Sequence, residues 1–306
     1  MTHEPVLLEE ILSILKEASK GKDDLTIVDG TLGLGGYSQA ILEAFQRGKV
    51  LGIDRDPDAL RLAEQRLGSF VPRFRAVQGN FGALKEILGD EALIDAFVFD
   101  LGVSNLQLSE AERGFSFQRD GPLDMRMDPQ GDAPTAAEVL ATSSAKELER
   151  IFWEHGEERY ARRIASRIVS LRQRGGRLET TGELVALIRD VLPQPVQRKM
   201  GGHPARRVFQ ALRIFINDEL SALGSMLSWV PALAARGCVI AIVSYHSLED
   251  RIVKHRFRAW EREEGRGHVL TRRPIVPGEA EVERNQKSRS AKLRAFRFVI
   301  EQPMRS

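Results

Sequence analysis

The stretch Thr26-Ile-Val-Asp-Gly-Thr-Leu-Gly-Leu-Gly-Gly-Tyr37 decides the fold. Its β-branched start is typical of the end of a buried strand, which meets Asp29 and then a loop with glycines at positions 33, 35 and 36. The segment Tyr37–Phe45 follows, with apolar residues at helical spacing. Glycines let the backbone approach a ligand, and the helix N-terminus offers it free N–H groups. Strand, glycine loop and helix therefore predict the opening unit of a nucleotide-binding α/β sheet.

The residues around this loop favour one ligand over the others. A dinucleotide fingerprint needs a third glycine where Ser38 stands, and Asp29 would repel a pyrophosphate but suits an ammonium or hydroxyls. A second strand, Val50–Ile53, ends in Asp54, the usual ribose clamp, because one carboxylate accepts from both hydroxyls. This arrangement predicts S-adenosyl-L-methionine as the cofactor. A tight strand–helix turn without a ligand is the alternative.

Composition limits the classes of protein that fit. The 306 residues are 42% hydrophobic and 29% charged, which is ordinary for a globular protein. No apolar run approaches the ~20 residues of a membrane span, and the start of the chain does not resemble a signal peptide. The single cysteine, Cys238, precedes an apolar run and is expected in the core. These features predict a cytoplasmic protein, and a net charge of +2 argues against a polybasic binder.

Strand and helix patterns alternate through the first hundred residues. Strands are predicted at Thr26–Asp29, Val50–Asp54, Arg75–Gln78 and Ala96–Asp100, and helices at His3–Leu15, Tyr37–Phe45, Pro57–Leu67 and Phe81–Leu88. Such alternation predicts a parallel sheet with ligands at the carboxyl ends of its strands. After the third strand, Phe81 is placed to cover an adenine and Asn80 to bond its edge. Packing of the helix on the sheet explains Phe81 equally well.

The fourth strand ends at Asp100, where this topology places the reacting group. Methyl transfer to an exocyclic amine needs no metal. It needs the amine in line behind the methyl group, and acceptors for the N–H protons. Asp100 suits either the amine protons or the ammonium of the cofactor, and the sequence leaves both roles open.

The pattern changes to all-helix between about residues 135 and 192. Three capping boxes mark helix starts, at Thr135 with Glu138, Ser144 with Glu147, and Thr180 with Glu183. A helical run between two parallel strands predicts an inserted domain. Its outer faces carry Arg159, Arg162, Arg163, Arg167, Arg172, Arg174 and Arg177. These arginines form either a solvated face or a lid that contacts phosphates.

The sheet resumes with a fifth strand, Cys238–Val243, followed by Ser-Tyr-His-Ser. His246 in this turn is placed to accept a proton from an amine or to bond a base; capping the following helix is the alternative. Near the end, the segment Arg284–Arg294 carries five cations and no acid before a last strand, Ala295–Ile300. That cationic loop is the strongest physical indication of RNA.

Several of these motifs together resemble the bacterial 16S rRNA cytosine-N4 methyltransferase family, also called RsmH or MraW. The motifs are Asp29-Gly-Thr-Leu-Gly-Leu-Gly-Gly36, Ile53-Asp-Arg-Asp-Pro57, Asp100-Leu-Gly-Val-Ser104, Arg113-Gly-Phe-Ser-Phe-Gln-Arg-Asp-Gly-Pro-Leu-Asp-Met-Arg-Met-Asp-Pro129, Ser244-Tyr-His-Ser-Leu-Glu-Asp-Arg251 and Arg289-Ser-Ala-Lys-Leu-Arg294. The resemblance runs from Glu4 to about Ile300, and the block from residue 113 to 129 is its most specific part.

The resemblance implies methylation of the exocyclic N4 of one decoding-centre (P-site) cytidine of 16S rRNA in the small ribosomal subunit. It implies a class I, Rossmann-like methyltransferase core with a mostly parallel seven-stranded sheet. We expect this core in residues 1–107 and 208–306, and an inserted helical substrate-recognition domain in residues 108–207. The resemblance implies no membrane and no metal, and it leaves a homodimer open.

Site residues are carried over by motif. The expected cofactor contacts are Gly35, Gly36, Tyr37, Asp54, Phe81, Asp100 and Gln107, and the expected catalytic residues are Asp100, Ser104 and His246. Tyr37 stands where relatives often have histidine, so its contact is expected from the main chain. Asp100-Leu-Gly-Val lacks the two prolines and the aromatic residue of many amino-methyltransferases. A stacking aromatic must then come from elsewhere, with Tyr245, Phe115 and Phe117 as candidates.

Readings from other classes remain open at this point. A dinucleotide-dependent oxidoreductase is disfavoured by Ser38 and Asp29. A non-catalytic RNA-binding or assembly factor is disfavoured by the intact glycine loop with Asp54. Within the methyltransferases, an enzyme for small molecules or DNA is the runner-up, and the arginine-rich insertion favours a polyanionic substrate over a small molecule.

Overall fold

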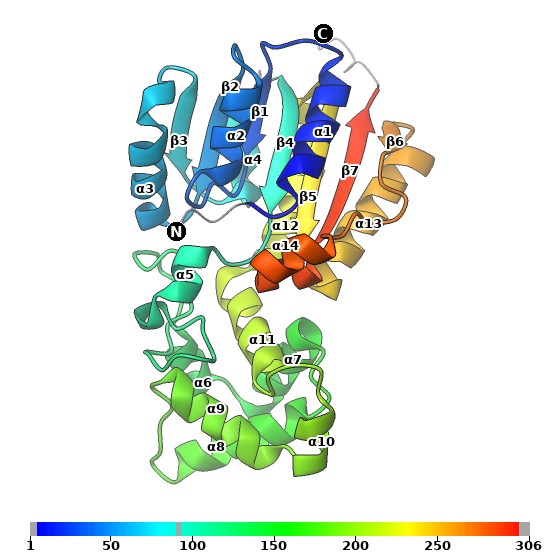
Figure 1. Cartoon of the computed structure of the whole chain (residues 1–306). Helices are drawn as coiled ribbons and strands as arrows, with labels where there is room; N and C mark the ends of the chain where they lie inside the picture. Colours follow the sequence, from blue (N-terminus) through cyan, green and yellow to red (C-terminus); the bar gives the residue numbers. More distant parts are fainter. Residues whose placement is uncertain (1–4, 90–92, 300–306) are drawn as a thin grey trace. The chain divides into compact units, whose positions relative to one another are not determined.

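The computed structural model describes residues 5–89 and 93–299. They contain a seven-stranded sheet in the order β3-β2-β1-β4-β5-β7-β6. The strands are β1 (Thr26–Asp29), β2 (Lys49–Asp54), β3 (Phe74–Gln78), β4 (Ile94–Asp100), β5 (Ala234–Ser244), β6 (Gly267–Val269) and β7 (Lys292–Phe298). The first five are parallel, and β7 runs antiparallel to its neighbours β5 and β6. The predicted mostly parallel, seven-stranded α/β fold is confirmed (Figure 1).

The predicted strands are found, and most of them begin earlier than predicted. β1 agrees at both ends, whereas β4 begins two residues earlier. β5 begins at Ala234 rather than Cys238, because Arg236 and Gly237 interrupt the apolar pattern without ending the strand. β7 begins at Lys292 and ends at Phe298, so the predicted Ala295–Ile300 was placed too late. β6 has only three residues, which are too few to show an alternating pattern of apolar residues, and it was not predicted.

The N-terminal helix differs from its prediction at both ends. α1 (Leu8–Ser19) replaces the predicted His3–Leu15, part of which lies outside the described residues. Leu7 and Lys20 flank the helix with φ near +50°, a left-handed conformation that ends α-helical geometry on each side. The Leu7 N–H instead donates to Glu281 Oε1 at 2.8 Å, which ties the start of α1 to α14 (Glu279–Arg284).

Strand residues alternate between two cores on opposite faces of the sheet. On β4, Ala96 and Val98 join one core with α1, α2 (Gly36–Ala44) and α3 (Pro57–Leu67). Phe97 and Phe99 join the other with α4 (Leu84–Leu88), α12 (Glu219–Leu233) and α13 (Ser247–Arg262). This period of two makes a three-layer sandwich, in which α1 and α2 lie in front of the sheet in Figure 1.

An aromatic cluster fixes α13 against the antiparallel edge of the sheet. Phe257 and Trp260 of α13 pack on Phe296 and Phe298 of β7, with ring centroids 5.0–5.6 Å apart. Phe257, Trp260 and Phe296 are at most 1% exposed. Aromatic pairs at this spacing contribute beyond their buried area, so the helix has one fixed rotation about its axis here.

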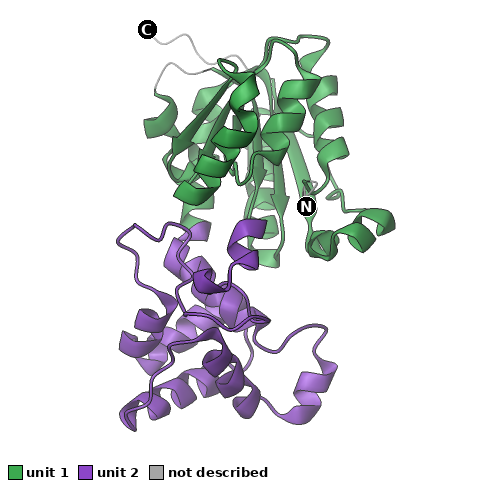
Figure 2. Cartoon of the chain, turned by 60° about the vertical axis from the view of Figure 1, so that its left-hand side comes forward, with its two compact units in different colours: residues 1–102, 220–306 green, residues 103–219 purple. Residues whose placement is uncertain are grey.

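The chain divides into two compact units. Unit 1 comprises residues 1–102 and 220–306, and unit 2 comprises residues 103–219 (Figure 2). These borders differ from the predicted ones, 107/108 and 207/208. Val103 and Leu108 pack on the core of unit 2, and α11 (Arg206–Asn217) supplies that core with Val208 and Leu212. The segments around both predicted borders therefore belong to the insertion.

Unit 2 is helical. Its helices are α5 (Asn105–Ser109), α6 (Ala136–Thr142), α7 (Ala145–Gly156), α8 (Ala161–Gln173), α9 (Thr181–Val191), α10 (Gln194–Lys199) and α11. All three predicted capping boxes are present, at the starts of α6, α7 and α9. Across residues 5–89 and 93–299, no helix is long and apolar enough to cross a membrane.

Candidate active site

The glycine loop lies between β1 and α2, and its shape admits no side chain at two positions. Gly35 precedes α2 with φ +77°, and a Cβ there would lie 2.8 Å from Leu67 Cδ1. A Cβ on Gly36 would lie 2.7 Å from Pro5 Cγ. The loop can therefore hold its backbone at the start of α2, where the N–H groups of the first turn have no partners within the helix.

Asp29 holds this loop in place through hydrogen bonds. Its carboxylate has no exposed surface and accepts a hydrogen bond from Ser38 Oγ at 2.7 Å and from Thr31 N at 3.4 Å. Burial raises its pKa to about 6, against the lowering effect of these hydrogen bonds. The side chain thus holds the loop instead of meeting a ligand, contrary to the sequence prediction. Ser38, which breaks the dinucleotide fingerprint, is its partner.

Asp54 ends β2 next to the loop, as the sequence predicts for a ribose clamp. Its Oδ2 accepts from Gly33 N at 2.7 Å and its Oδ1 from Asp56 N at 3.0 Å. Burial raises the pKa of this carboxyl above its usual value. Each oxygen retains a second lone pair, and the side chain is only half-buried, so both can accept from a diol.

Asp100 ends β4 and is enclosed by hydroxyl groups. Tyr245 OH, after β5, donates to Asp100 Oδ1 at 2.7 Å, and the Asp100 N–H donates to Thr31 Oγ1 at 2.6 Å. Burial raises the Asp100 pKa to about 7, against the lowering effect of the hydrogen bond from Tyr245. Tyr37 is itself buried and donates to Val6 O at 2.5 Å, which leaves its main chain to face a ligand.

The three carboxyls gather at one edge of the sheet without a cation. The charge of Asp29 raises the pKa of Asp100, and the charge of Asp54 raises the pKa of Asp29. Among residues 5–89 and 93–299, no lysine or arginine pairs with Asp29, Asp54 or Asp100. Asp54 and Asp100, which are only partly buried, suit a ligand that brings positive charge and hydroxyl groups.

Phe81 lies at the start of a short 3-10 helix after β3. Its ring meets Phe99 edge-on, with centroids 5.9 Å apart, and it is half-buried against that core. The predicted packing role is therefore present, and the exposed part of the ring is available to a ligand. Asn80 Oδ1 accepts from Gly82 N at 2.9 Å, so its oxygen caps this turn and only its amide N–H₂ remains for a base.

His246 caps α13, which was the alternative to a catalytic role. Its Nδ1 accepts from Glu249 N at 3.5 Å, and Glu249 Oε2 accepts from His246 N at 3.3 Å and from Tyr245 N at 2.9 Å. His246 Nε2 also lies 3.1 Å from Glu249 Oε1. This capping box fixes the turn that presents the Tyr245 hydroxyl to Asp100.

A pair of substitutions tests the role of His246. We expect His246→Ala to lower both methyl transfer and the free energy of unfolding, the latter by about 0.5–2 kcal/mol, because a helix cap is lost. His246→Asn, which restores a capping side chain, should recover most of both. Urea unfolding and kcat, measured on the same preparations, check this. A stable but inactive asparagine variant would instead place the imidazole on the substrate.

Ser104 and Gln107 belong to unit 2 and form a capping box with each other. Gln107 N donates to Ser104 Oγ at 3.2 Å, and Ser104 N donates to Gln107 Oε1 at 3.0 Å at the start of α5. The catalytic role of Ser104 and the cofactor contact of Gln107 stay predictions.

Two of the candidate stacking aromatics are also in unit 2. Phe115 is buried in its core, so it is not available to a base. Phe117 stacks on His203 at 4.7 Å between ring centroids.

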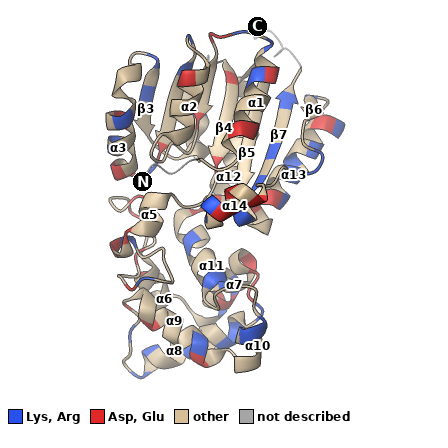
Figure 3. Cartoon of the chain, viewed as in Figure 1, with Lys and Arg blue, Asp and Glu red and all other residues tan. Residues whose placement is uncertain are grey.

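The predicted cationic loop is less free than its sequence indicates. Lys292 Nζ lies 3.4 Å and Arg294 Nε 2.6 Å from the carboxylate of Asp250 on α13. Arg284 and Lys287 also take part in interactions. In Figure 3, α14 carries acidic as well as basic residues. In unit 2, Arg172 donates to three carbonyls at the end of α6, so this arginine is structural.

A family model and curated proteins both match nearly the whole of this chain. A model of the MraW methylase family matches residues 1–299. Proteins named ribosomal RNA small subunit methyltransferase H are similar to this chain. The protein of Gloeobacter violaceus is 46% identical, and the alignment covers 96% of this chain and 88% of that protein. The protein of Heliobacterium modesticaldum is 44% identical, and the alignment covers 96% of this chain and 97% of that protein. A solved rRNA methylase from Streptococcus thermophilus aligns over 98% of this chain and 99% of its own at 13% identity, with a TM-score of 0.43, too low to add support.

Proposed function

This chain belongs to the MraW methylase family, and we propose that it transfers a methyl group from S-adenosylmethionine to the N4 of one P-site cytidine of 16S rRNA. The relatives whose names specify small-subunit rRNA cover nearly the whole chain at more than 40% identity, which supports the substrate. Work on ribosomal subunits would place the protein in the cytoplasm. We further propose that the helical unit 2 recognises the substrate.

The observation that carries this proposal is the environment of Asp100. A carboxyl with a pKa of about 7 ends the strand next to β1, within hydrogen-bonding distance of the Tyr245 hydroxyl. Asp54 ends the strand on the other side of β1, at the glycine loop. This spacing of acids suits a ligand with a diol at one end and a cationic centre at the other.

The cofactor fits the donors present at this edge. When bound, it supplies a methyl group on a sulfonium, which the amine nitrogen attacks. Asp54 would accept hydrogen bonds from the ribose hydroxyls, the main chain of Gly35, Gly36 and Tyr37 would face the amino-acid end, and Phe81 would cover the adenine.

Asp100 then acts on the cytosine amine. The N4 nitrogen loses one proton as it gains the methyl group, and the Asp100 carboxylate is the acceptor that this edge offers. A pKa near 7 is suited to this, because about half of the carboxyls are ionised at neutral pH and the ionised form is basic enough to take a proton. Tyr245 holds the carboxylate in place by donating to it.

This role predicts a pH dependence. Because the Asp100 pKa is raised to about 7, the carboxyl is neutral below that pH and unable to accept a proton. We expect kcat to rise about tenfold per pH unit up to about pH 7 and then to level off. Single-turnover rates at saturating cofactor and subunits, measured from pH 5.5 to 8.5, check this. A rate that is flat across this range would remove Asp100 as the acceptor.

Label transfer tests the function as a whole. Small subunits and naked 16S rRNA are prepared from cells that lack the enzyme and incubated with methyl-tritiated S-adenosylmethionine, with DNA and transfer RNA as controls. Label on small-subunit rRNA alone is the expected result. Label on DNA or on a small molecule would keep the assignment as a methyltransferase and contradict the proposed substrate.

A further inference from the structure

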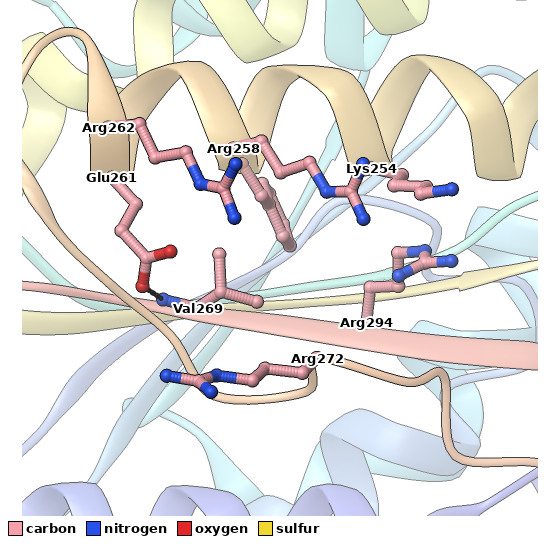
Figure 4. A pocket seen from close by; sticks show the side chains of 8 residues that line it. Lys254, Arg258, Glu261, Arg262, Val269, Arg272 and Arg294 are labelled. Atoms are coloured by element: carbon pink, nitrogen blue, oxygen red, sulfur yellow. Dashed lines mark hydrogen bonds between the residues drawn. The ribbon is translucent and has the colours of Figure 1, made fainter.

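Unit 1 contains a cavity of about 220 Å³ between α13 and the antiparallel edge of the sheet. Its walls carry Lys254, Arg258 and Arg262 from α13, Arg272 from the segment after β6, and Arg294 from β7 (Figure 4). We call it the α13 cavity. None of its residues has a role in the site around Asp100.

The helix side of the α13 cavity is a column of like charges. Lys254, Arg258 and Arg262 follow one another at intervals of four residues, so they lie on one face of α13. Among residues 5–89 and 93–299, none of these three side chains forms an ion pair with an acid. Like charges at this spacing destabilise a helix, so the column is unfavourable unless an anion offsets it.

The opposite wall adds two more guanidinium groups. Arg272 is exposed, whereas Arg294 is 6% exposed and fixed by Asp250, to which its Nε donates at 2.6 Å. Asp250 is shared with Lys292, and Glu261, the acid of the cavity, accepts from Val269 N at 2.9 Å. In Figure 4 the guanidinium groups of Arg258 and Arg262 point down from the helix, and that of Arg294 lies below Lys254. The cavity is therefore strongly cationic.

The cavity is also held in shape before any ligand arrives. Phe257 forms part of its lining and packs in the aromatic cluster of α13 and β7. That cluster fixes the rotation of α13 and so the direction of its cationic face. Of the guanidinium groups, that of Arg294 is held by Asp250 before binding, and the planar fork of arginine matches the oxygens of a phosphate.

We propose that the α13 cavity binds phosphate groups of the rRNA strand that flanks the target nucleotide; this inference rests on the proposed function. Lys254 lies about 12 Å along the helix axis from His246, the residue at the carboxyl edge, and Arg262 about 24 Å. The cations thus lead away from the active site in steps of about 6 Å. A nucleic-acid strand whose target base reaches Asp100 can lay successive phosphates along this column.

The test neutralises two cations and compares a matched control. Arg258→Gln with Arg262→Gln removes two charges from the α13 cavity, and Arg61→Gln with Arg75→Gln removes two exposed charges from α3 and β3. Binding of full-length wild-type and variant chains to unmethylated 16S rRNA and to small subunits is measured by filter retention from 50 to 400 mM salt. Thermal unfolding and cofactor affinity are measured in parallel.

We expect the cavity variant to bind rRNA about ten- to a hundredfold more weakly than the control variant. Its slope of log affinity against log salt should fall by about 1.4–1.8, since two phosphate contacts are lost. Cofactor affinity and melting temperature should stay unchanged. A single Arg272→Gln variant, outside the helix, should show about half the change in slope.

Equal affinity and slope in the cavity and control variants would overturn the inference. Loss of binding to polyglutamate but not to rRNA would also overturn it, in favour of an acidic protein partner. If the wild-type chain binds rRNA through the cavity but transfers no label to it, the proposed function fails, and the α13 cavity remains an RNA-binding site without a target nucleotide. If it transfers label and the variants match the control, only this inference fails.

Discussion

Replacing Asp100 by asparagine is expected to lower kcat by about 10²- to 10⁴-fold, the range that general acid–base catalysis contributes. Asparagine keeps the shape of the side chain, and its Oδ1 can still accept from Tyr245 OH. It cannot take a proton from the amine. The rate of label transfer, sampled at fixed times with saturating cofactor and small subunits, measures the change in kcat.

Stability provides a second readout for this variant. The Asp100 pKa is raised in the folded chain, so the folded chain binds this proton more tightly than the unfolded chain does. The resulting stabilisation is fully present below the usual pKa of 3.8 and is lost as pH rises through about 7. Asparagine does not titrate. The Asp100→Asn chain should therefore melt at an equal or higher temperature than the wild type at pH 8. This result would show that its lower kcat does not come from unfolding.

A matched control lies on the same strand. Asp95 accepts from Thr26 N at 2.8 Å near the amino end of β4, away from the carboxyl edge. Asp95→Asn removes one charge from β4 and should leave kcat within about twofold of the wild type, since it lies outside the site. An Asp100→Asn chain that keeps more than a tenth of wild-type kcat would exclude Asp100 as the acceptor.

Replacing Gly30 by alanine is expected to destabilise the fold by about 3 kcal/mol or more, at the upper end of overpacking effects. A Cβ at this position would lie 2.0 Å from Phe99 Cε1 and 2.4 Å from Phe99 Cδ1, far closer than van der Waals contact. The backbone cannot retreat easily, because Gly30 N donates to Val98 O at 2.9 Å. Phe99 would have to move, and Phe81 packs on it. Urea unfolding measures the loss.

Gly68→Ala is the control for this substitution. Gly68 has φ −56°, and a Cβ there would meet nothing within 4 Å, so the change should be neutral or slightly stabilising. A double variant, Gly30→Ala with Phe99→Leu, should recover part of the lost stability, since leucine is smaller than phenylalanine and leaves room for the new methyl group. Wild-type stability of the Gly30→Ala chain would contradict the close approach.

The fold was largely predictable because its signals are local. The glycine loop, the alternating elements and the three capping boxes each depend on residues within a few positions of one another. β6 escaped prediction because three residues carry no period. The borders of the two compact units differ from the predicted domain borders, because the sequence of α11 does not show which core the helix packs on. Only its contacts assign Val208 and Leu212 to unit 2.

The candidate site was predictable where it depends on strand ends. Asp54 and Asp100 follow apolar runs, so topology alone brings them to one edge of the sheet. The burial of Asp29 and the bond from Tyr245 to Asp100 depend on contacts across the fold, the latter between residues 145 positions apart. The pairing of Arg294 with Asp250 was hidden for the same reason.

One signal in the sequence was overlooked. Lys254, Arg258 and Arg262 stand at intervals of four residues, which the printed sequence already shows. The cationic loop near the end of the chain was instead interpreted as the indication of RNA. Helical periodicity applied to charge, rather than to apolar residues alone, would have pointed to the α13 cavity.

The most direct test of the central claim is to identify the methylated atom. Small subunits from cells lacking the enzyme are incubated with the purified chain and S-adenosylmethionine, and their rRNA is digested and analysed by mass spectrometry. We predict N4-methylcytidine at a single P-site position of 16S rRNA, formed at a rate about 10²- to 10⁴-fold lower with the Asp100→Asn chain. A methyl group on another atom, or on no nucleotide although the chain binds the cofactor, would contradict the account.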